Sequence, residues 1–208
     1  MLDKKVFESF ILKVNQSCQQ FYVWMYANNE FAKHQEKWNK TFTKLERFLE
    51  DKGCKYKNFW DVVILTLQQA WKLGIIRLFD PSYFSKDVKK ENPRLSLCYI
   101  SELLEDDSLK QFITEEINKH SNFIESIKKQ RPSLAHNDTK AINNKIEAGV
   151  ENLFEGLDKI ITEIKNRNPH LKDCNDINRE LTEKLSKSGV DEIFEALLEI
   201  DNLEKKEE

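Results

Sequence analysis

The sequence has few residues that turn a chain sharply, with only 5 glycines and 4 prolines among 208 residues. All-β proteins need many turns and usually place Gly, Pro and Asn in them, so this scarcity argues against an all-β fold. The longest uninterrupted run of apolar residues, with tyrosine counted, covers residues 21–27. It is far shorter than the roughly 18 residues of a membrane span, so we expect no membrane-spanning segment.

Several kinds of site are missing as well. The glycines stand apart, so there is no Gly-rich loop to bind a phosphate, and there is no GxSxG motif. The four cysteines (Cys18, Cys54, Cys98 and Cys174) form no CxxC pair, and no cluster of metal ligands is visible. We therefore predict no metal and no cofactor. The chain has no pattern of a secretion signal, which predicts a cytoplasmic protein with free thiols.

The residues that are present suit a folded protein with a sizeable core. Apolar residues make up 39% of the chain and aromatic residues 11%. The 33 Lys and Arg residues nearly balance the 36 Asp and Glu residues, for a formal net charge of −3. A charge this small gives no overall attraction to nucleic acid, although local patches can still attract it.

Apolar residues recur at helical spacing along nearly the whole chain. The pattern predicts an all-α fold: a helical bundle over residues 1–168 and a helical, acidic appendage over residues 169–208. The predicted helices cover residues 3–27, 29–50, 56–79, a short stretch from Ser96, 107–130 and 139–167. Two shorter amphipathic segments are expected after residue 170.

One stretch carries candidate chemistry at the predicted junction of two long helices. Arg131 and His136 are separated by four residues there, and Asn137 and Asp138 follow as a turn or helix cap. Residues 128–145 hold five cations and only one acid, whereas residues 190–208 hold eight acids and two lysines. Cations favour helix C-termini, which by itself accounts for Lys128 and Lys129. The candidate RNA-binding residues are Lys128, Lys129, Lys140 and Lys145.

An Arg-x4-His motif at a helix junction in an all-helical chain resembles the HEPN superfamily, and more specifically its abortive-infection type U branch. Residues 134–138 (Leu-Ala-His-Asn-Asp) are similar to the family's Ala-His-x-Asp ending. Residues 77–81 (Arg-Leu-Phe-Asp-Pro) resemble that branch's signature at the end of its second core helix. Residues 95–97 (Leu-Ser-Leu) resemble the start of its next helix. The resemblance covers roughly residues 5–168.

The resemblance implies a homodimer in which the two motifs meet, and a metal-independent endoribonuclease of a toxin-like or antiphage system. His136 would be the acid–base group and Arg131 would bind the phosphate. Asn137 and Asp138 would shape the turn and orient the histidine. An antitoxin or another defence-system protein is a possible partner.

Two alternatives stay open at this point. Arg77 and Asp80 either form an ion pair or cap at a helix end, or contribute polar groups to the same cleft as the motif. The protein itself is either the ribonuclease or a non-catalytic helical dimer that binds RNA, a nucleotide or a protein partner. Pro132, directly after Arg131, and the net negative charge favour binding, whereas Arg131, His136 and their basic surroundings favour cleavage.

Overall fold

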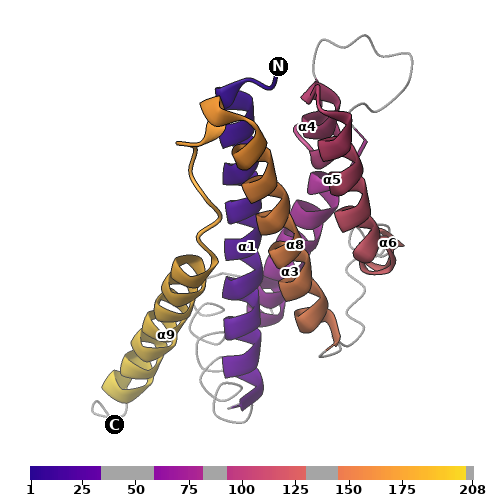
Figure 1. The fold of residues 1–208 in the computed structure, drawn as a ribbon. Helices are drawn as coiled ribbons and strands as arrows, with labels where there is room; N and C mark the ends of the chain where they lie inside the picture. The colour runs from indigo at the N-terminus through magenta and orange to yellow at the C-terminus, as the bar shows by residue number, and fades with distance from the viewer. Residues whose placement is uncertain (34–58, 82–92, 130–144, 205–208) are drawn as a thin grey trace. The chain divides into compact units, whose positions relative to one another are not determined.

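The protein is all-α, as predicted. The structure, a computed structural model, describes residues 1–33, 59–81, 93–129 and 145–204, and all regular structure in these ranges is helical (Figure 1). None of the described helices combines the length and apolar character needed to cross a bilayer. The elements are α1 (Lys4–Lys33), α3 (Phe59–Leu78), α4 (Leu97–Leu103), α5 (Asp107–Lys119), α6 (Ser121–Lys129), α8 (Lys145–Arg167), the 3-10 helix η1 (Pro169–Leu171) and α9 (Arg179–Glu204).

The N-terminal helix is longer than predicted. A break was expected near residue 28, but α1 continues without interruption to Lys33. This segment holds two asparagines but no glycine or proline, so nothing in it prevents a helix. Phe31 packs against a buried cluster that includes Ala27 one turn earlier, and this contact stabilises the last turns of α1.

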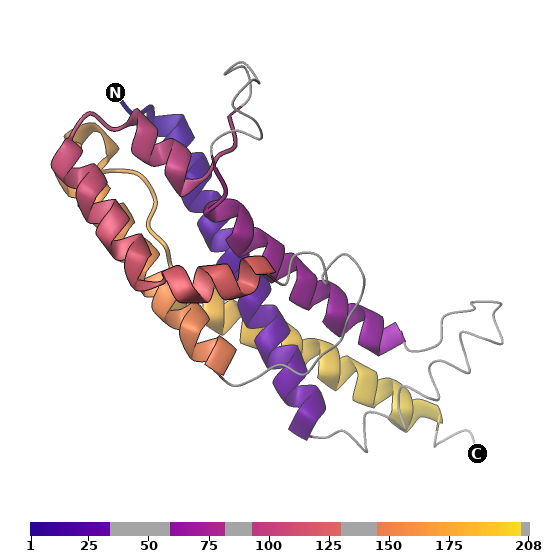
Figure 2. The ribbon, with the colours of Figure 1, turned by 90° about the vertical axis from the view of Figure 1, so that its right-hand side faces the viewer.

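The helix predicted over residues 107–130 is in fact two helices, α5 and α6, and the chain turns sharply between them (Figure 2). His120 separates them, with φ −107° and ψ 3°. The Ser121 hydroxyl donates a hydrogen bond of 2.9 Å to the Asn118 carbonyl at this turn. The His120 ring lies so close to α8 that a Cβ on Gly156 would be 2.6 Å from its Nε2. The missing side chain of Gly156 therefore makes room for the turn.

The two short segments predicted after residue 170 form one continuous helix, α9, that begins at Arg179. Gly189 lies in its interior, where a glycine costs about 1 kcal/mol relative to alanine. Two side-chain pairs at i, i+4 spacing span this position. Lys187 Nζ lies 2.8 Å from Asp191 Oδ2, and the Ser188 hydroxyl donates to Glu192 over 3.2 Å. Such pairs support a helix through a weak position.

Contacts group the chain into two compact units. Unit 1 consists of Met1–Cys18 and Lys72–Arg179, and unit 2 consists of Gln19–Trp71 and Glu180–Glu208. The division at residue 168 that the sequence suggested stays a prediction.

The apolar stripe of α8 is buried in unit 1. Helix α8 packs against α5 and against η1, and α5 also contacts α6. The apolar spacing in the sequence predicted this face, and the structure confirms it for the part of α8 whose side chains are described. Its buried residues are Val150, Leu153, Phe154, Leu157, Ile160, Ile161 and Ile164.

Unit 2 is built around aromatic side chains. Trp24 and Trp71 are both fully buried, with ring centroids 5.3 Å apart, and Phe21 meets Trp71 edge-on at 5.5 Å. Tilted and edge-on pairs at such distances are favourable beyond the area that they bury. A second cluster brings Val190 and Phe194 of α9 against Ala27 of α1. The Tyr26 hydroxyl adds a hydrogen bond of 2.5 Å to Glu183 Oε1.

Candidate functional site

The predicted motif itself lies outside the described residues. This applies to Arg131, His136, Asn137, Asp138 and Lys140. Of Lys145 the structure describes only its place at the start of α8. The helices on either side, α6 up to Lys129 and α8 from Lys145, are described and belong to unit 1.

Helices α6 and α8 touch each other close to where the motif connects them in sequence. A Cβ on Gly149 would lie only 2.5 Å from the ring of Phe123, so α8 presents bare backbone to an aromatic side chain of α6. Ile124 and Ile127 are buried on the same helix. A glycine permits such a close approach because it has no side chain. The motif therefore joins two helices that are in direct contact.

Two of the predicted RNA-binding lysines occupy the last turn of α6. Lys128 is one-third exposed, and its Nζ lies 3.3 Å from Glu125 Oε1. Lys129 is exposed. Cations at the C-terminus of a helix offset the partial negative charge of its last carbonyl groups. Both lysines are therefore placed where they stabilise the C-terminus of α6. The exposure of Lys129 also leaves its ammonium group accessible to a phosphate.

Asp80, two residues after the end of α3, forms an ion pair that is largely buried. Its carboxylate accepts a hydrogen bond from Arg94 Nη1 at 2.8 Å, and the two side chains are only 6% and 20% exposed. Arg77, in the last turn of α3, is exposed. Asp80 therefore pairs with Arg94, a residue not singled out in the sequence, and the role of Arg77 stays a prediction. Asp80 and Arg94 are 14 positions apart, too far for a local sequence pattern to have suggested the pair.

Ser96 caps α4 two residues beyond Arg94. Its hydroxyl accepts a hydrogen bond from the Tyr99 amide over 3.4 Å, its backbone is extended and the residue is fully buried. Serine is among the preferred residues at this position because it satisfies an amide that has no partner within the helix. The predicted start of a short helix at Ser96 is confirmed. The ion pair of Arg94 with Asp80 connects the residues just before this helix to the end of α3.

The pKa of the Cys98 thiol, in the first turn of α4, is influenced by several charged residues. Burial raises its pKa, while the positive charge of Lys128 acts to lower it and the charges of Glu102 and Asp80 act to raise it. The thiol is therefore kept protonated and is a poor nucleophile. Lys128 and Asp80 therefore both lie near enough to Cys98 for their charges to act on it, although the three residues are far apart in sequence. The sequence pattern did not indicate that Cys98 lies near Asp80 and Lys128.

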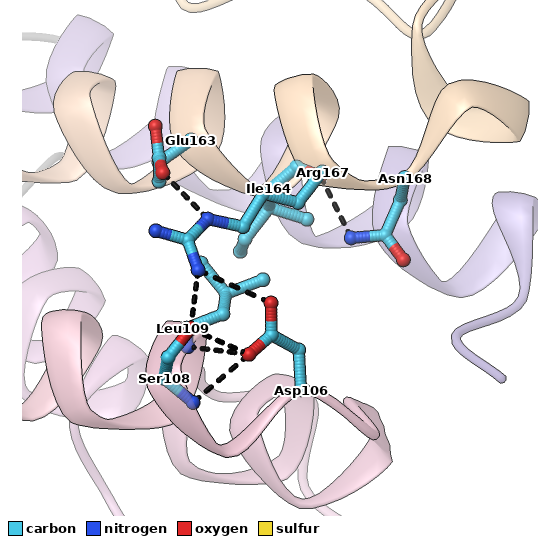
Figure 3. A network of polar contacts seen from close by, with 7 residues as sticks. All are labelled: Asp106, Ser108, Leu109, Glu163, Ile164, Arg167 and Asn168. Atoms are coloured by element: carbon cyan, nitrogen blue, oxygen red, sulfur yellow. Dashed lines mark hydrogen bonds and ion pairs between the residues drawn. The ribbon is translucent and has the colours of Figure 1, made fainter.

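A polar network fixes the opposite ends of α5 and α8 (Figure 3). Asp106 caps α5 by accepting hydrogen bonds from the Ser108 and Leu109 amides at 2.9 and 3.1 Å. Arg167, in the last turn of α8, donates to Asp106 at 3.1 Å and to the Ser108 hydroxyl at 2.5 Å. Its Nε also donates to Glu163 at 2.6 Å. The network ties the start of α5 to the end of α8 and so sets the register between the two helices.

This network predicts a pH-dependent contribution to stability. The pKa of Asp106 is lowered from 3.8 to about 2, mainly by the hydrogen bond from the Ser108 hydroxyl and further by the Leu109 amide and Arg167. Because folding lowers this pKa, the carboxylate stabilises the native state above about pH 4, and the contribution is lost as the pH falls toward about 2. Asp106→Asn keeps a capping acceptor but removes the charge. We expect a modestly lower Tm than wild type at neutral pH.

The difference in Tm between Asp106→Asn and wild type should shrink as the pH is lowered from about 4 to about 2, which thermal denaturation monitored by circular dichroism measures. The effect stays small because the group is exposed and solvent screens it. A difference in Tm that is the same at every pH would show that the charge contributes nothing.

Among the residues that the structure describes, no three His, Cys, Asp or Glu side chains come together as ligands for a metal ion. No family model, curated protein or solved structure matches the chain. The case for a function therefore depends on the sequence motif and on the helices beside it.

Proposed function

We propose that the protein is a metal-independent endoribonuclease of the HEPN type, belonging to a toxin-like or antiphage abortive-infection system in the cytoplasm. The observation that carries this proposal is the Arg131–His136 motif, at the connection between two helices that pack directly against each other through Phe123 and Gly149. Two lysines, Lys128 and Lys129, end α6 one residue before the motif begins.

The chemistry of these side chains suits cleavage of RNA by its own 2′-hydroxyl. A histidine with an ordinary pKa near 6.5 accepts the proton of the 2′-OH or gives one to the departing 5′-oxygen. An arginine stays charged and binds phosphate oxygens through two hydrogen bonds as negative charge develops in the transition state. His136 and Arg131 take these two roles. The oxygen–phosphorus bond to the 2′-oxygen forms as the bond to the 5′-oxygen breaks, which leaves a 2′,3′-cyclic phosphate.

The surroundings of the motif support phosphate binding. Lys128 and Lys129 precede it and Lys140 and Lys145 follow it, so an RNA backbone meets net positive charge there. Asp80 is paired with Arg94, which offsets the negative charge of its carboxylate. Arg77, one turn earlier and exposed, is a candidate for a further contact with RNA.

A homodimer completes the proposed site. One histidine and one arginine are few groups for phosphodiester cleavage, whereas two copies related by a two-fold axis supply two of each. Two-fold pairs are also the commonest protein oligomers. A nuclease of this kind has to be restrained in its own cell, so an antitoxin or another defence-system protein is an expected partner.

The test is cleavage by purified protein with EDTA present. We expect single-stranded RNA to be cut into fragments that end in a 2′,3′-cyclic phosphate, identified by mass spectrometry. DNA and 2′-O-methyl RNA of the same sequence should remain intact, because both lack the nucleophile. Cleavage of DNA, or loss of all cleavage on adding EDTA, would contradict the mechanism. Binding of RNA in a gel-shift assay without any cleavage would favour the non-catalytic dimer.

A further inference from the structure

Helix α9 carries exposed apolar side chains along one row. Leu185 is 60% exposed and Ile193 is 54% exposed, and Gly189 lies halfway between them. These three residues are spaced at i, i+4 and i+8, which places them in one of the side-chain rows through which helices most often pack. The row differs from the face that α9 turns to its own unit, where Ser186, Val190 and Phe194 are buried.

The middle of this row is open. A Cβ added to Gly189 would meet no atom within 4 Å. A glycine inside a helix destabilises it by about 1 kcal/mol relative to alanine, and nothing within the described structure needs the space that Gly189 leaves. A missing side chain between two exposed apolar residues does permit the backbone of another helix to come close.

The charges along α9 are unequal and favour one orientation of a partner. Residues 180–189 hold two lysines and two acids, whereas residues 190–204 hold six acids and no cation. Lys184 and Glu192 are both exposed and lie four residues on either side of Ser188. A two-fold axis near Ser188 therefore places Lys184 of each copy beside Glu192 of the other. A parallel arrangement would instead bring the two acidic halves together.

We propose that α9 pairs with α9 of a second copy of this chain in antiparallel orientation, with the crossing point at Ser188 and Gly189. Leu185 of one copy then lies beside Ile193 of the other, and the backbones approach each other at the glycine. This contact is additional to the motif dimer, because the motif at residues 131–136 is a different segment of the chain. It does not depend on the protein being a ribonuclease.

Cross-linking tests the position of the contact. With Cys54 and Cys98 replaced by serine, Gly189→Cys is expected to form a disulfide-linked dimer on mild oxidation, which reducing agent reverses. Ser188→Cys, which keeps the glycine, is the second variant. Leu12→Cys is the matched control, because Leu12 is 56% exposed but lies on α1, and it should cross-link at least about tenfold less. Adding Ile193→Arg should lower cross-linking at position 189 to the control level.

Charge reversal tests the orientation of the contact. Lys184→Glu and Glu192→Lys should each weaken self-association about three- to tenfold in sedimentation velocity, and the double variant should restore it. The two residues are about 12 Å apart on one helix, so restoration requires pairing between copies.

Each of these variants is also made in a protein that carries His136→Ala. Cross-linking and self-association should be the same with and without this substitution. This separates the α9 contact from nuclease activity. Circular dichroism confirms that each variant is folded. Folded protein that fails to cross-link at both 188 and 189, or a double variant as weak as the singles, would overturn the proposal.

Discussion

Replacing His136 with alanine is expected to lower the rate of RNA cleavage by about 10² to 10⁴, the range that a positioned acid–base group contributes. The loss should fall on the chemical step, so RNA binding in a gel-shift assay should change little. The measurement compares wild type and His136→Ala on the same RNA, at the same protein concentration and with EDTA present.

The matched control for that experiment is His170→Ala. His170 lies outside the motif, and its Nε2 is 2.9 Å from the Leu2 carbonyl oxygen. The control variant therefore removes a histidine whose contact is structural. This variant should cleave RNA at the wild-type rate. Equal cleavage by wild type and His136→Ala would instead indicate a contaminating nuclease and would remove the support for the proposed mechanism.

The helices could be predicted from the sequence where their apolar residues repeat without a change of face. The residues from Val150 to Ile164 show this on α8, where one regular stripe is buried. The predicted helix boundaries were wrong where contacts between residues far apart in sequence, or side-chain pairs across a glycine, decide whether a helix ends. The turn at His120 is accommodated by its close approach to Gly156, a residue 36 positions away. Local helix propensity cannot predict such a contact. The continuity of α9 depends on side-chain pairs that span a glycine.

The candidate site could be predicted only in part for the same reason. The arginine, the histidine and the lysines around them form a local pattern, and a local pattern can be found in a sequence. The pairing of Asp80 with Arg94, and the effect of the Lys128 charge on Cys98, arise because the ends of α3 and α6 lie near the start of α4. Aspartate and arginine are both too common for a single pair, separated by 14 residues, to be recognised.

Two features of unit 1 hold the helices beside the motif. The polar network of Asp106 and Arg167 fixes one end of the α5–α8 pair, and the close packing of Phe123 on Gly149 fixes α6 against α8 nearer the motif. A site in which two groups act on one phosphate requires such support, because catalysis is sensitive to small displacements of either group. The ion pair of Asp80 with Arg94 fastens the end of α3 to the start of α4 in the same unit.

Replacing Arg94 with alanine is therefore expected to destabilise the protein by about 3 kcal/mol, the lower end for breaking a buried pair. Asp80 is only 6% exposed and would lose its ion pair with Arg94, whereas Arg94 is 20% exposed and already has some contact with water. A loss of this size lowers Tm by about 6–12 °C in a protein of this length. Urea denaturation followed by circular dichroism measures the change in the free energy of unfolding.

The matched control for Arg94→Ala is Lys110→Ala, which breaks the pair with Asp107 on the surface of α5, where the two side chains are 37% and 92% exposed. It should cost less than about 1 kcal/mol, since exposed pairs contribute little. The double variant Asp80→Asn, Arg94→Ala should be more stable than Arg94→Ala alone, because an amide is less costly to bury than a carboxylate without its charged partner. If Arg94→Ala were no more harmful than Lys110→Ala, the pair would not be what fastens α3 to α4.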